Sequence, residues 1–338
     1  MTETVLIASY VEPELVARVR SAWDGDVLYE PSLLPAPRYA ADHNGTRPAL
    51  DPAAETRWRE LLGRAEISFD FDWWQPDRMP DNCPKLRWVQ ATSAGIGGFV
   101  RRHGLDRGDI VFTTAAGAHA VPLAEFALTG ALYLVKGVPD LLDRQRRHHW
   151  QRYTTRSLAG RRVTVVGLGH IGRHVAEVFA ALGTRVVGVA RPGGSHPHLP
   201  GVTVTEDVDR ALPDTDVLVL ATPLTDDTRH LIDRRRLGLL PAGAVLVNVA
   251  RGPVVDQQAL VAALSAGRLG GAALDVTDPE PLPADSPLWD MPNVLLSPHS
   301  AATLATENEA LVELFVDNLT RWRTGRPLRN RYRDDLGY

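Results

Sequence analysis

Residues 160–191, with the sequence GRRVTVVGLGHIGRHVAEVFAALGTRVVGVAR, have the pattern of a strand, a glycine-rich turn, a helix and a second strand. The apolar, β-branched run at 163–166 is typical of a strand that is buried on both faces of a parallel sheet. Gly167, Gly169 and Gly172 follow at the spacing G-x-G-x-x-G, and apolar residues recur after them at helical intervals. This unit predicts an α/β fold built on a parallel sheet.

The three glycines have separate physical roles in such a turn. Gly167 makes the tight turn, Gly169 lets the backbone approach a pyrophosphate, and Gly172 lets the helix pack closely on the strand. The start of the helix offers free N–H groups and a partial positive charge to phosphates. Because the motif lies between a strand and a helix, it predicts dinucleotide binding rather than a tight turn in some other α/β domain.

The end of the second strand indicates which dinucleotide is bound. An NAD site usually ends this strand with an Asp or Glu that binds the ribose 2′-hydroxyl, but this chain has Ala190 and Arg191 there. With no carboxylate to repel it, a 2′-phosphate can pair with Arg191. We therefore predict NADP(H) in preference to NAD(H). In the alternative, Arg191 is solvated and either His196, His198 or no side chain contacts the ribose.

The composition excludes several classes of protein. At 338 residues, with 44% of them apolar, the chain has room for two or three packed domains. Its net charge of −4 lacks the basic excess that indicates nucleic-acid binding. The single cysteine, Cys83, fits a reducing compartment, and neither a signal-peptide pattern nor an apolar run of bilayer-spanning length is present. We expect a cytoplasmic protein without nucleic-acid or membrane partners.

Two α/β domains are predicted along the chain. Short strands at 4–8, 66–71, 86–90 and 110–113, a helix at 14–23 and an irregular loop or lid at 31–54 indicate a smaller first domain. Further strands are expected at 216–221, 244–249, 271–275 and 293–296, with helices between most of them. The fold class is thus α/β, with two Rossmann-like doubly wound domains and an active-site cleft between them.

Two helices connect these domains in the predicted fold. A long helix at 122–148, which Pro139 can kink or break, links them and offers an apolar surface for either an intrachain core or a homodimer interface. The helix at 306–323 follows the last strand and is expected to pack back on the first domain. We therefore assign 1–120 plus 302–338 to a flavodoxin-like substrate-binding domain and 121–301 to a dinucleotide-binding Rossmann domain.

Three charged side chains follow successive strands of the second domain. Arg251, Glu280 and His299 each come after an apolar strand, in turns that Pro or Gly stiffens. In open α/β sheets, ligands bind outside the carboxyl ends of the strands. A guanidinium can grip the carboxylate of a 2-keto acid, an imidazole can supply a proton at neutral pH, and a carboxylate can orient that imidazole. Each residue alone is more commonly a surface or loop residue, but their combined placement indicates a catalytic site.

Other candidate residues have open alternatives. Asp275 can cap a turn or hold the nicotinamide carboxamide, and His119 can reach the cleft or make a hydrogen bond at the start of a helix. The glycine-rich turn 92–98 can hold a small anion or be a plain loop. No metal-binding motif, paired cysteines or covalent-nucleophile motif is present, so we predict no metal.

These motifs resemble the D-isomer-specific 2-hydroxyacid dehydrogenase family. The resemblance covers about residues 91–302 and rests on TSAGIGG, HAVPLAEFAL, VVGLGHIG, ATPLTDDTRHLI, VNVARGPVVD, LDVTDPEPL and SPHSA. The HAVP stretch and Arg191 are more similar to the glyoxylate/hydroxypyruvate reductase branch, which favours small 2-keto acids and NADPH. The chain departs from the family pattern at Ala190 and Gly97, where many members have Asp.

The resemblance implies roles for individual residues. Arg251 would bind the substrate, Glu280 would orient His299, and His299 would be the acid–base residue that protonates the carbonyl oxygen of a 2-keto acid as hydride arrives. Trp73 and Trp74 would border the substrate cleft, where they could admit a bulkier apolar side chain. The residues implied at the cofactor are Gly167, Gly169, His170, Ile171, Gly172, Arg191, Thr222, Pro223, Thr228, Ala250 and Asp275, and those implied at the substrate carboxylate are Ala94, Gly95 and Ile96.

Two other functions use much the same fold. Some relatives of the family are nucleotide-sensing regulators that keep the catalytic trio, and such a protein would bind the cofactor without turnover. Oxidation of a small oxyanion such as phosphite is a further alternative. The expected partners are a small 2-keto or 2-hydroxy acid and a second copy of the chain in a homodimer.

Overall fold

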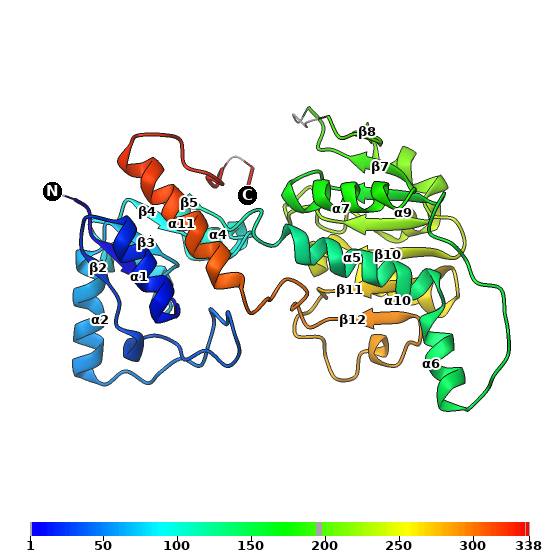
Figure 1. Cartoon of the computed structure of the whole chain (residues 1–338), viewed down its shortest axis with the longest axis horizontal. Helices are drawn as coiled ribbons and strands as arrows, with labels where there is room; N and C mark the ends of the chain where they lie inside the picture. The colour runs from blue at the N-terminus through cyan, green and yellow to red at the C-terminus, as the bar shows by residue number, and fades with distance from the viewer. Residues whose placement is uncertain (1, 194–197, 335, 338) are drawn as a thin grey trace. The chain divides into compact units, whose positions relative to one another are not determined.

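The chain forms two compact units in a computed structural model that describes residues 2–193, 198–334, 336 and 337. The first unit combines Met1–Ala118 with Thr303–Tyr338, and the second unit is His119–Ala302. Each unit has its own parallel sheet with helices packed on it (Figure 1). The predicted α/β class with two Rossmann-like sheets is confirmed. His196 lies outside the described residues.

The second unit contains a seven-stranded parallel sheet. Its strand order is β12-β11-β10-β9-β6-β7-β8, which is the order of a doubly wound dinucleotide-binding sheet extended by one strand. The chain winds outward from β6 to β8, returns to the other side and continues from β9, so the topological switch point lies between β6 and β9. The strands are β6 (Arg162–Val166), β7 (Arg185–Val189), β8 (Val202–Thr205), β9 (Val217–Leu220), β10 (Ala244–Asn248), β11 (Leu269–Leu274) and β12 (Val294–Leu296).

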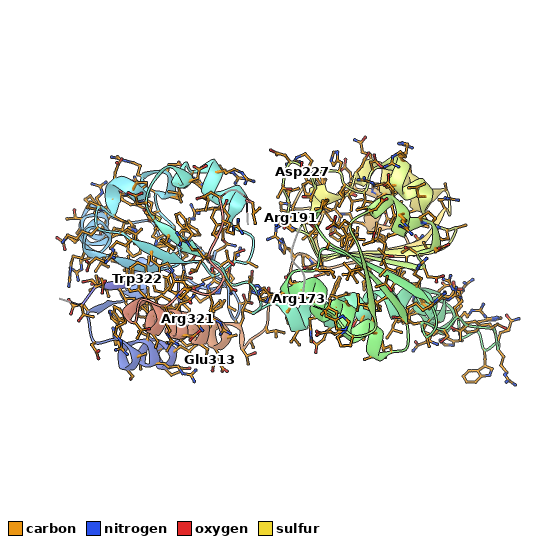
Figure 2. All side chains as sticks on the ribbon, turned by 90° about the horizontal axis from the view of Figure 1, so that it is seen from above. Arg173, Arg191, Asp227, Glu313, Arg321 and Trp322 are labelled. Atoms are coloured by element: carbon orange, nitrogen blue, oxygen red, sulfur yellow. The ribbon has the colours of Figure 1, made fainter. Side chains whose placement is uncertain are left out.

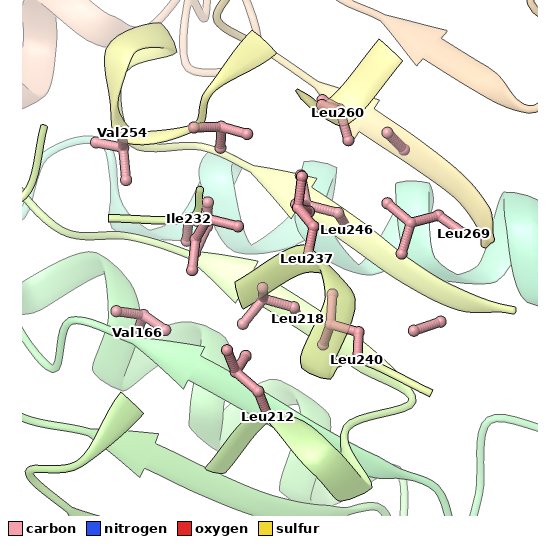
Figure 3. Close-up of a cluster of buried hydrophobic side chains, with 14 of the residues drawn as sticks. Val166, Leu212, Leu218, Ile232, Leu237, Leu240, Leu246, Val254, Leu260 and Leu269 are labelled. Atoms are coloured by element: carbon pink, nitrogen blue, oxygen red, sulfur yellow. The ribbon is translucent and has the colours of Figure 1, made fainter. Parts of the chain in front are cut away.

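Both faces of this sheet are buried. Along β9, Leu218 and Leu220 pack into one apolar cluster (Figure 3), while Val217 and Val219 pack into the other. Successive side chains of a strand point to opposite faces, so one apolar run supplies both cores. The helices that cover the sheet or extend from it are α5 (Ala120–Val135), α6 (Val138–Arg146), α7 (His170–Ala181), α8 (Val208–Ala211), α9 (Arg234–Leu239) and α10 (Gln257–Ser265).

The helical stretch predicted at 122–148 is broken, as Pro139 led us to expect, but the break comes two residues earlier. The chain forms α5 and α6 instead, with an angle of 61° between them. The break occurs at Gly137, whose φ of +66° is left-handed and ends the regular helix, and Pro139 then lies in the first turn of α6. α5 packs closely on the sheet, because a Cβ on Gly130 would lie 2.4 Å from the Ala273 Cβ atom.

The first unit contains a five-stranded parallel sheet of order β2-β1-β3-β4-β5, the flavodoxin-like order, with its switch point between β1 and β3. α11 comes from the C-terminal part of the chain and packs beside α1 (Figure 1), as predicted. The predicted loop at 31–54 contains a short 3-10 turn at Pro31–Leu33, and its end forms the first turn of α2. The elements are β1 (Val5–Ile7), β2 (Val27–Leu28), β3 (Ile67–Phe69), β4 (Trp88–Gln90), β5 (Val111–Thr113), α1 (Pro13–Ala22), α2 (Pro52–Arg64), α3 (Met79–Asn82), α4 (Gly97–Arg102) and α11 (Glu307–Arg323).

Within the described residues, no helix taken alone has the length and apolarity to cross a bilayer. The bent pair α5 and α6 passes that test only when its two members are counted together, and only by length and composition.

Replacing Leu246 by alanine should lower the free energy of unfolding by about 2–5 kcal/mol, because the side chain is fully buried in the cluster of Figure 3 and its removal leaves a cavity. Chemical denaturation monitored by circular dichroism measures the change. Leu182→Ala is the matched control, since Leu182 is 42% exposed and its loss should cost about 0.5 kcal/mol or less. Equal losses in the two variants would contradict the assignment of this core.

Candidate active site

The glycine-rich turn after β6 has no room for side chains at two positions. Gly167 has a φ of +94°, and a Cβ there would lie 2.7 Å from the carbonyl oxygen of Ala221. A Cβ on Gly172 would lie 1.7 Å from the carbonyl oxygen of Gly167. The turn and the start of α7 therefore approach each other more closely than any larger residue permits.

The third glycine leaves the approach to α7 open. Gly169 is exposed, and a Cβ there would meet nothing within 4 Å. It is also the N-cap residue of α7, and no side chain caps that end of the helix. The start of a twelve-residue helix thus has neither a capping side chain nor a crowded N-cap residue, which fits a pyrophosphate. His170 is exposed in the first turn, whereas Ile171 packs against the core.

The loop after β9 borders the same turn. A Cβ on Gly167 would lie 2.9 Å from the Cα atom of Thr222, so the two segments are in contact. The Thr228 hydroxyl donates to the carbonyl oxygen of Pro223 at 2.6 Å and accepts from the N–H of Thr225 at 2.7 Å. In this structure Thr228 therefore holds the loop in shape.

Arg191 is exposed directly after β7, beyond the buried Ala190. In Figure 2 it lies toward the same side of the second unit as Arg173 and Asp227, which also follow strands of this sheet. A carboxylate that sequence reasoning missed lies beside this turn, since the Gly193 N–H donates to Glu206 Oε1 at 3.0 Å. Glu206 follows the edge strand β8, which is too short and polar for its place in the sheet to be predicted.

The three charged residues follow three neighbouring strands. Arg251 comes after β10, Glu280 after β11 and His299 after β12, and these strands are adjacent in the sheet. The structure brings two of the side chains into direct contact, because His299 Nδ1 lies 2.6 Å from Glu280 Oε1. The side chains of His299 and Glu280 are 45% and 41% exposed, so the pair is open to a ligand.

The charges in this group influence one another. The hydrogen bond from His299 lowers the pKa of Glu280 despite its partial burial, and the charge of Arg251 adds to the effect. Burial lowers the pKa of Arg251, while Glu280 and Asp275 offset part of that change. The Glu280 carboxyl group is consequently ionised at neutral pH and lies against the His299 ring.

Two contacts that the sequence did not reveal hold the Arg251 turn. The Asn248 side chain accepts from the Ala250 N–H at 3.0 Å and donates to the carbonyl oxygen of Arg251 at 3.2 Å. A Cβ on Gly252 would lie 1.8 Å from the carbonyl oxygen of Thr277. The absence of a side chain at this glycine lets the turn after β10 touch the loop that carries Glu280.

Asp275 is buried and holds the turn that carries His299. Its Oδ1 accepts from the Ser297 hydroxyl at 2.6 Å and from the Ala301 N–H at 2.9 Å. The His299 N–H also donates to the Asp275 carbonyl oxygen at 2.9 Å. These bonds hold His299 at a φ of +56°, a conformation that is strained for a residue other than glycine. Of the alternatives for Asp275, the turn-capping contact is present.

The remaining candidates lie at a helix start or in the first unit. His119 is the N-cap residue of α5. The Trp73 ring lies tilted by 42° against the Trp58 ring, with centroids 6.1 Å apart. The Trp74 N–H donates to Asp72, so both tryptophans take part in packing of the first unit. The predicted substrate turn precedes the short helix α4, with Ala94 partly exposed, Gly95 exposed and Ile96 buried.

A family model described as "D-isomer specific 2-hydroxyacid dehydrogenase, NAD binding domain" matches residues 128–301. The chain belongs to this family. The family predicted from the motifs is therefore confirmed, the protein is an oxidoreductase, and its second unit is the nicotinamide-cofactor-binding domain. Within the described residues, no group of three or more His, Cys, Asp or Glu side chains has an arrangement that could hold a metal ion.

Several family members resemble the chain over most of its length. It is 33% identical to glyoxylate/hydroxypyruvate reductase A from Arabidopsis thaliana over 276 residues, which are 80% of this chain and 84% of the relative. A family structure from Xanthobacter autotrophicus Py2 in complex with NADPH and MES has a TM-score of 0.80 at 30% identity and covers 100% of both chains. The structure of an NADPH-dependent glyoxylate/hydroxypyruvate reductase from Sinorhizobium meliloti has a TM-score of 0.79 at 25% identity, covering 99% of this chain and 100% of that one.

Proposed function

We propose that this dehydrogenase reduces small 2-keto acids of the glyoxylate and hydroxypyruvate type to D-2-hydroxy acids with NADPH. The observation that carries the proposal is the contact between Glu280 and His299, at the carboxyl edge of a cofactor-binding sheet and beside Arg251. A proton donor, a carboxylate that orients it and a group that binds the substrate carboxylate are the side chains that 2-keto acid reduction needs besides the hydride donor. The names of the relatives support the choice of small substrates.

The residues of the second unit fit a dinucleotide. Gly167, Gly169 and Gly172, with the N-terminus of α7, would hold the pyrophosphate, and Thr222 and Pro223 would line the cofactor. Ala250, Asp275 and their neighbours at the ends of β10 and β11 would border the nicotinamide. When bound, the reduced nicotinamide supplies hydride to the carbonyl carbon.

The protein side chains would bind the substrate carboxylate and protonate its carbonyl oxygen. Arg251 would bind the substrate carboxylate through two parallel N–H bonds. The backbone N–H groups of Ala94, Gly95 and Ile96, which belong to the first unit, stay predicted ligands of a substrate carboxylate. Protonated His299 would donate a hydrogen bond to the carbonyl oxygen and transfer its proton to that oxygen. Glu280 fixes the ring through Nδ1, which leaves Nε2 for the substrate.

Replacing His299 by alanine should lower kcat for reduction of glyoxylate or hydroxypyruvate by about 10²–10⁴-fold, the usual contribution of a positioned proton donor. Loss of cofactor absorbance measures the rate. His174→Ala is the matched control, because His174 is also paired with a glutamate, Glu177, at 3.5 Å on the surface of α7.

Wild-type turnover in the His299 variant would contradict the acid–base role. Binding of cofactor by the wild-type protein without turnover across a panel of 2-keto acids would instead favour a nucleotide-sensing regulator. Turnover with phosphite alone would favour the oxyanion reaction.

Glu280→Gln should lower kcat/KM more at neutral and alkaline pH than in acid, because the substitution replaces an ionised carboxylate beside His299 Nδ1 with a neutral amide. The pKa of Glu280 is lowered, so the wild-type carboxylate is ionised at neutral pH and becomes neutral only in acid, where the difference between the two proteins should shrink. Glu177→Gln is the control. An equal loss of activity at every pH would mean that Glu280 only orients the ring.

Arg191→Ala should lower kcat/KM for NADPH by about tenfold or more and leave kcat/KM for NADH within about threefold, because a charged hydrogen bond to a 2′-phosphate contributes about 1.5–3 kcal/mol. Steady-state kinetics with both cofactors measure the change. Arg185→Ala is the control, since Arg185 is exposed at the other end of β7. A wild-type preference for NADH would contradict the assignment, and Glu206 would then be the group to test at the ribose.

The homodimer and the cytoplasmic location stay predictions. Exposed apolar side chains on α6 and the segment after it support an interface there, since exposed apolar groups commonly mark contact surfaces. They are Leu141, Leu142, Trp150 and Tyr153.

A further inference from the structure

A second group of polar side chains lies at the carboxyl edge of the first unit's sheet. Ser9 follows β1, Asp70 directly follows β3, and Thr92 follows β4, and these three strands are neighbours. The switch point of this sheet lies between β1 and β3. Ligands of open α/β sheets bind at the carboxyl ends of the strands at such a point, so Ser9 and Asp70 occupy the position where a ligand group is expected.

Asp70 is held in place by the turn that follows β4. Its Oδ2 accepts from the Thr92 hydroxyl at 3.1 Å, and the N–H groups of Phe71 and Thr92 also donate to the carboxyl group. The Asp70 N–H donates to the carbonyl oxygen of Gln90 at 2.8 Å. The residue is partly exposed and has a left-handed φ of +72°. Several donors thus fix the carboxyl group of a partly exposed residue at the sheet edge.

His43 closes one side of this group. It comes from the irregular loop before α2, and its Nδ1 lies 2.9 Å from the Ser9 hydroxyl. Its Nε2 is buried and has no hydrogen-bond partner among the described residues. Desolvation raises the pKa of Asp70 above its ordinary value, and the charge of His43 and the hydrogen bonds to the carboxylate offset part of that rise. The Asp70 carboxyl group therefore has several hydrogen-bond donors and an imidazole nearby.

The same turn links Asp70 to the proposed substrate site. Thr92, which contacts Asp70, is separated from Ala94 by one residue, and the backbone at 94–96 is proposed to hold the substrate carboxylate. All of these residues belong to the first unit. A substrate bound to this turn would therefore lie at the same sheet edge as Asp70, because β3 and β4 are neighbours.

We propose that Asp70 selects the substrate side chain by charge, favouring 2-keto acids with a neutral or hydrogen-bond-donating side chain and rejecting those with a second anionic group. The proposal rests on the proposed 2-keto acid reduction. A hydroxyl can donate to the Asp70 carboxylate, whereas a second carboxylate or a phosphate meets a like charge in a partly desolvated site. Discrimination of this kind works by penalising the wrong ligand.

The test compares three keto acids of similar size, namely hydroxypyruvate, 2-oxobutyrate and oxaloacetate. Asp70→Asn removes the charge, keeps the shape and tolerates a left-handed φ. The kcat/KM ratio of hydroxypyruvate to oxaloacetate should fall by about 10- to 100-fold in the variant, mainly through a gain with oxaloacetate, as expected for a like charge at an effective dielectric constant near 20. The value for 2-oxobutyrate should stay within about threefold.

Two further variants separate local from general effects. Asp81→Asn removes the same charge from an exposed position on α3 and should leave the ratio unchanged. Asp70→Gly also suits the left-handed backbone and gives a second measurement if the asparagine variant folds poorly. An unchanged ratio in folded Asp70 variants, with normal hydroxypyruvate turnover in the wild type, overturns the charge selection and leaves the proposed function intact.

A wild-type protein that reduces none of these keto acids would overturn the proposed function instead. The charge selection is then tested by calorimetry, which measures the affinities of D-glycerate and D-malate for the NADPH-loaded wild type and for Asp70→Asn. A gain in D-malate affinity confined to the variant supports the selection, and equal affinities in the two proteins overturn it.

Discussion

The His299 turn depends on one buried carboxylate. Asp275 accepts two hydrogen bonds at Oδ1, from Ser297 and Ala301, and its carbonyl oxygen accepts the His299 N–H. Hydrogen bonds to a charged acceptor in a buried setting are stronger than neutral ones, and losing one leaves an unsatisfied buried group. This is enough to hold His299 in a left-handed conformation that an L-residue otherwise avoids. The backbone conformation of His299, after β12, is thus fixed by a residue that follows the neighbouring strand β11.

Close packing of two other segments brings the remaining charges into range. Gly252 lets the turn after β10 touch the loop after β11, because a Cβ there would overlap the Thr277 carbonyl group. Arg251 and Glu280 are thereby near enough for each to influence the pKa of the other. The partial burial that lowers the pKa of Arg251 also strengthens its attraction for an anion, since both effects follow from the reduced solvent screening. The close packing at this edge therefore both brings Arg251 and Glu280 together and reduces the solvent screening of their charges.

Sequence reasoning located what is encoded locally and missed what tertiary contacts determine. The β-branched runs and the glycine spacing predicted β6, α7 and β7, because periodicity and turn geometry are properties of a short segment. The roles of Ser297 and Asn248 had no local signal, since each is defined by a partner in another turn. The break between α5 and α6 was assigned to Pro139, although the left-handed Gly137 is what ends α5, and a glycine in a helical pattern does not by itself show its φ.

The two sheets of this chain use the same topological rule for different chemistry. In the second unit, the switch point between β6 and β9 carries Gly167 and Thr222, where bare backbone would face the pyrophosphate in the proposed cofactor site. In the first unit, the switch point between β1 and β3 carries Ser9 and Asp70, where side chains take the place of bare backbone. Glycine suits the cofactor pyrophosphate, which is the same for every keto acid that is reduced, because backbone N–H groups bind a negative charge without distinguishing its carrier. A carboxylate suits the substrate side chain, which varies from one keto acid to another, because its charge discriminates between ligands of similar shape.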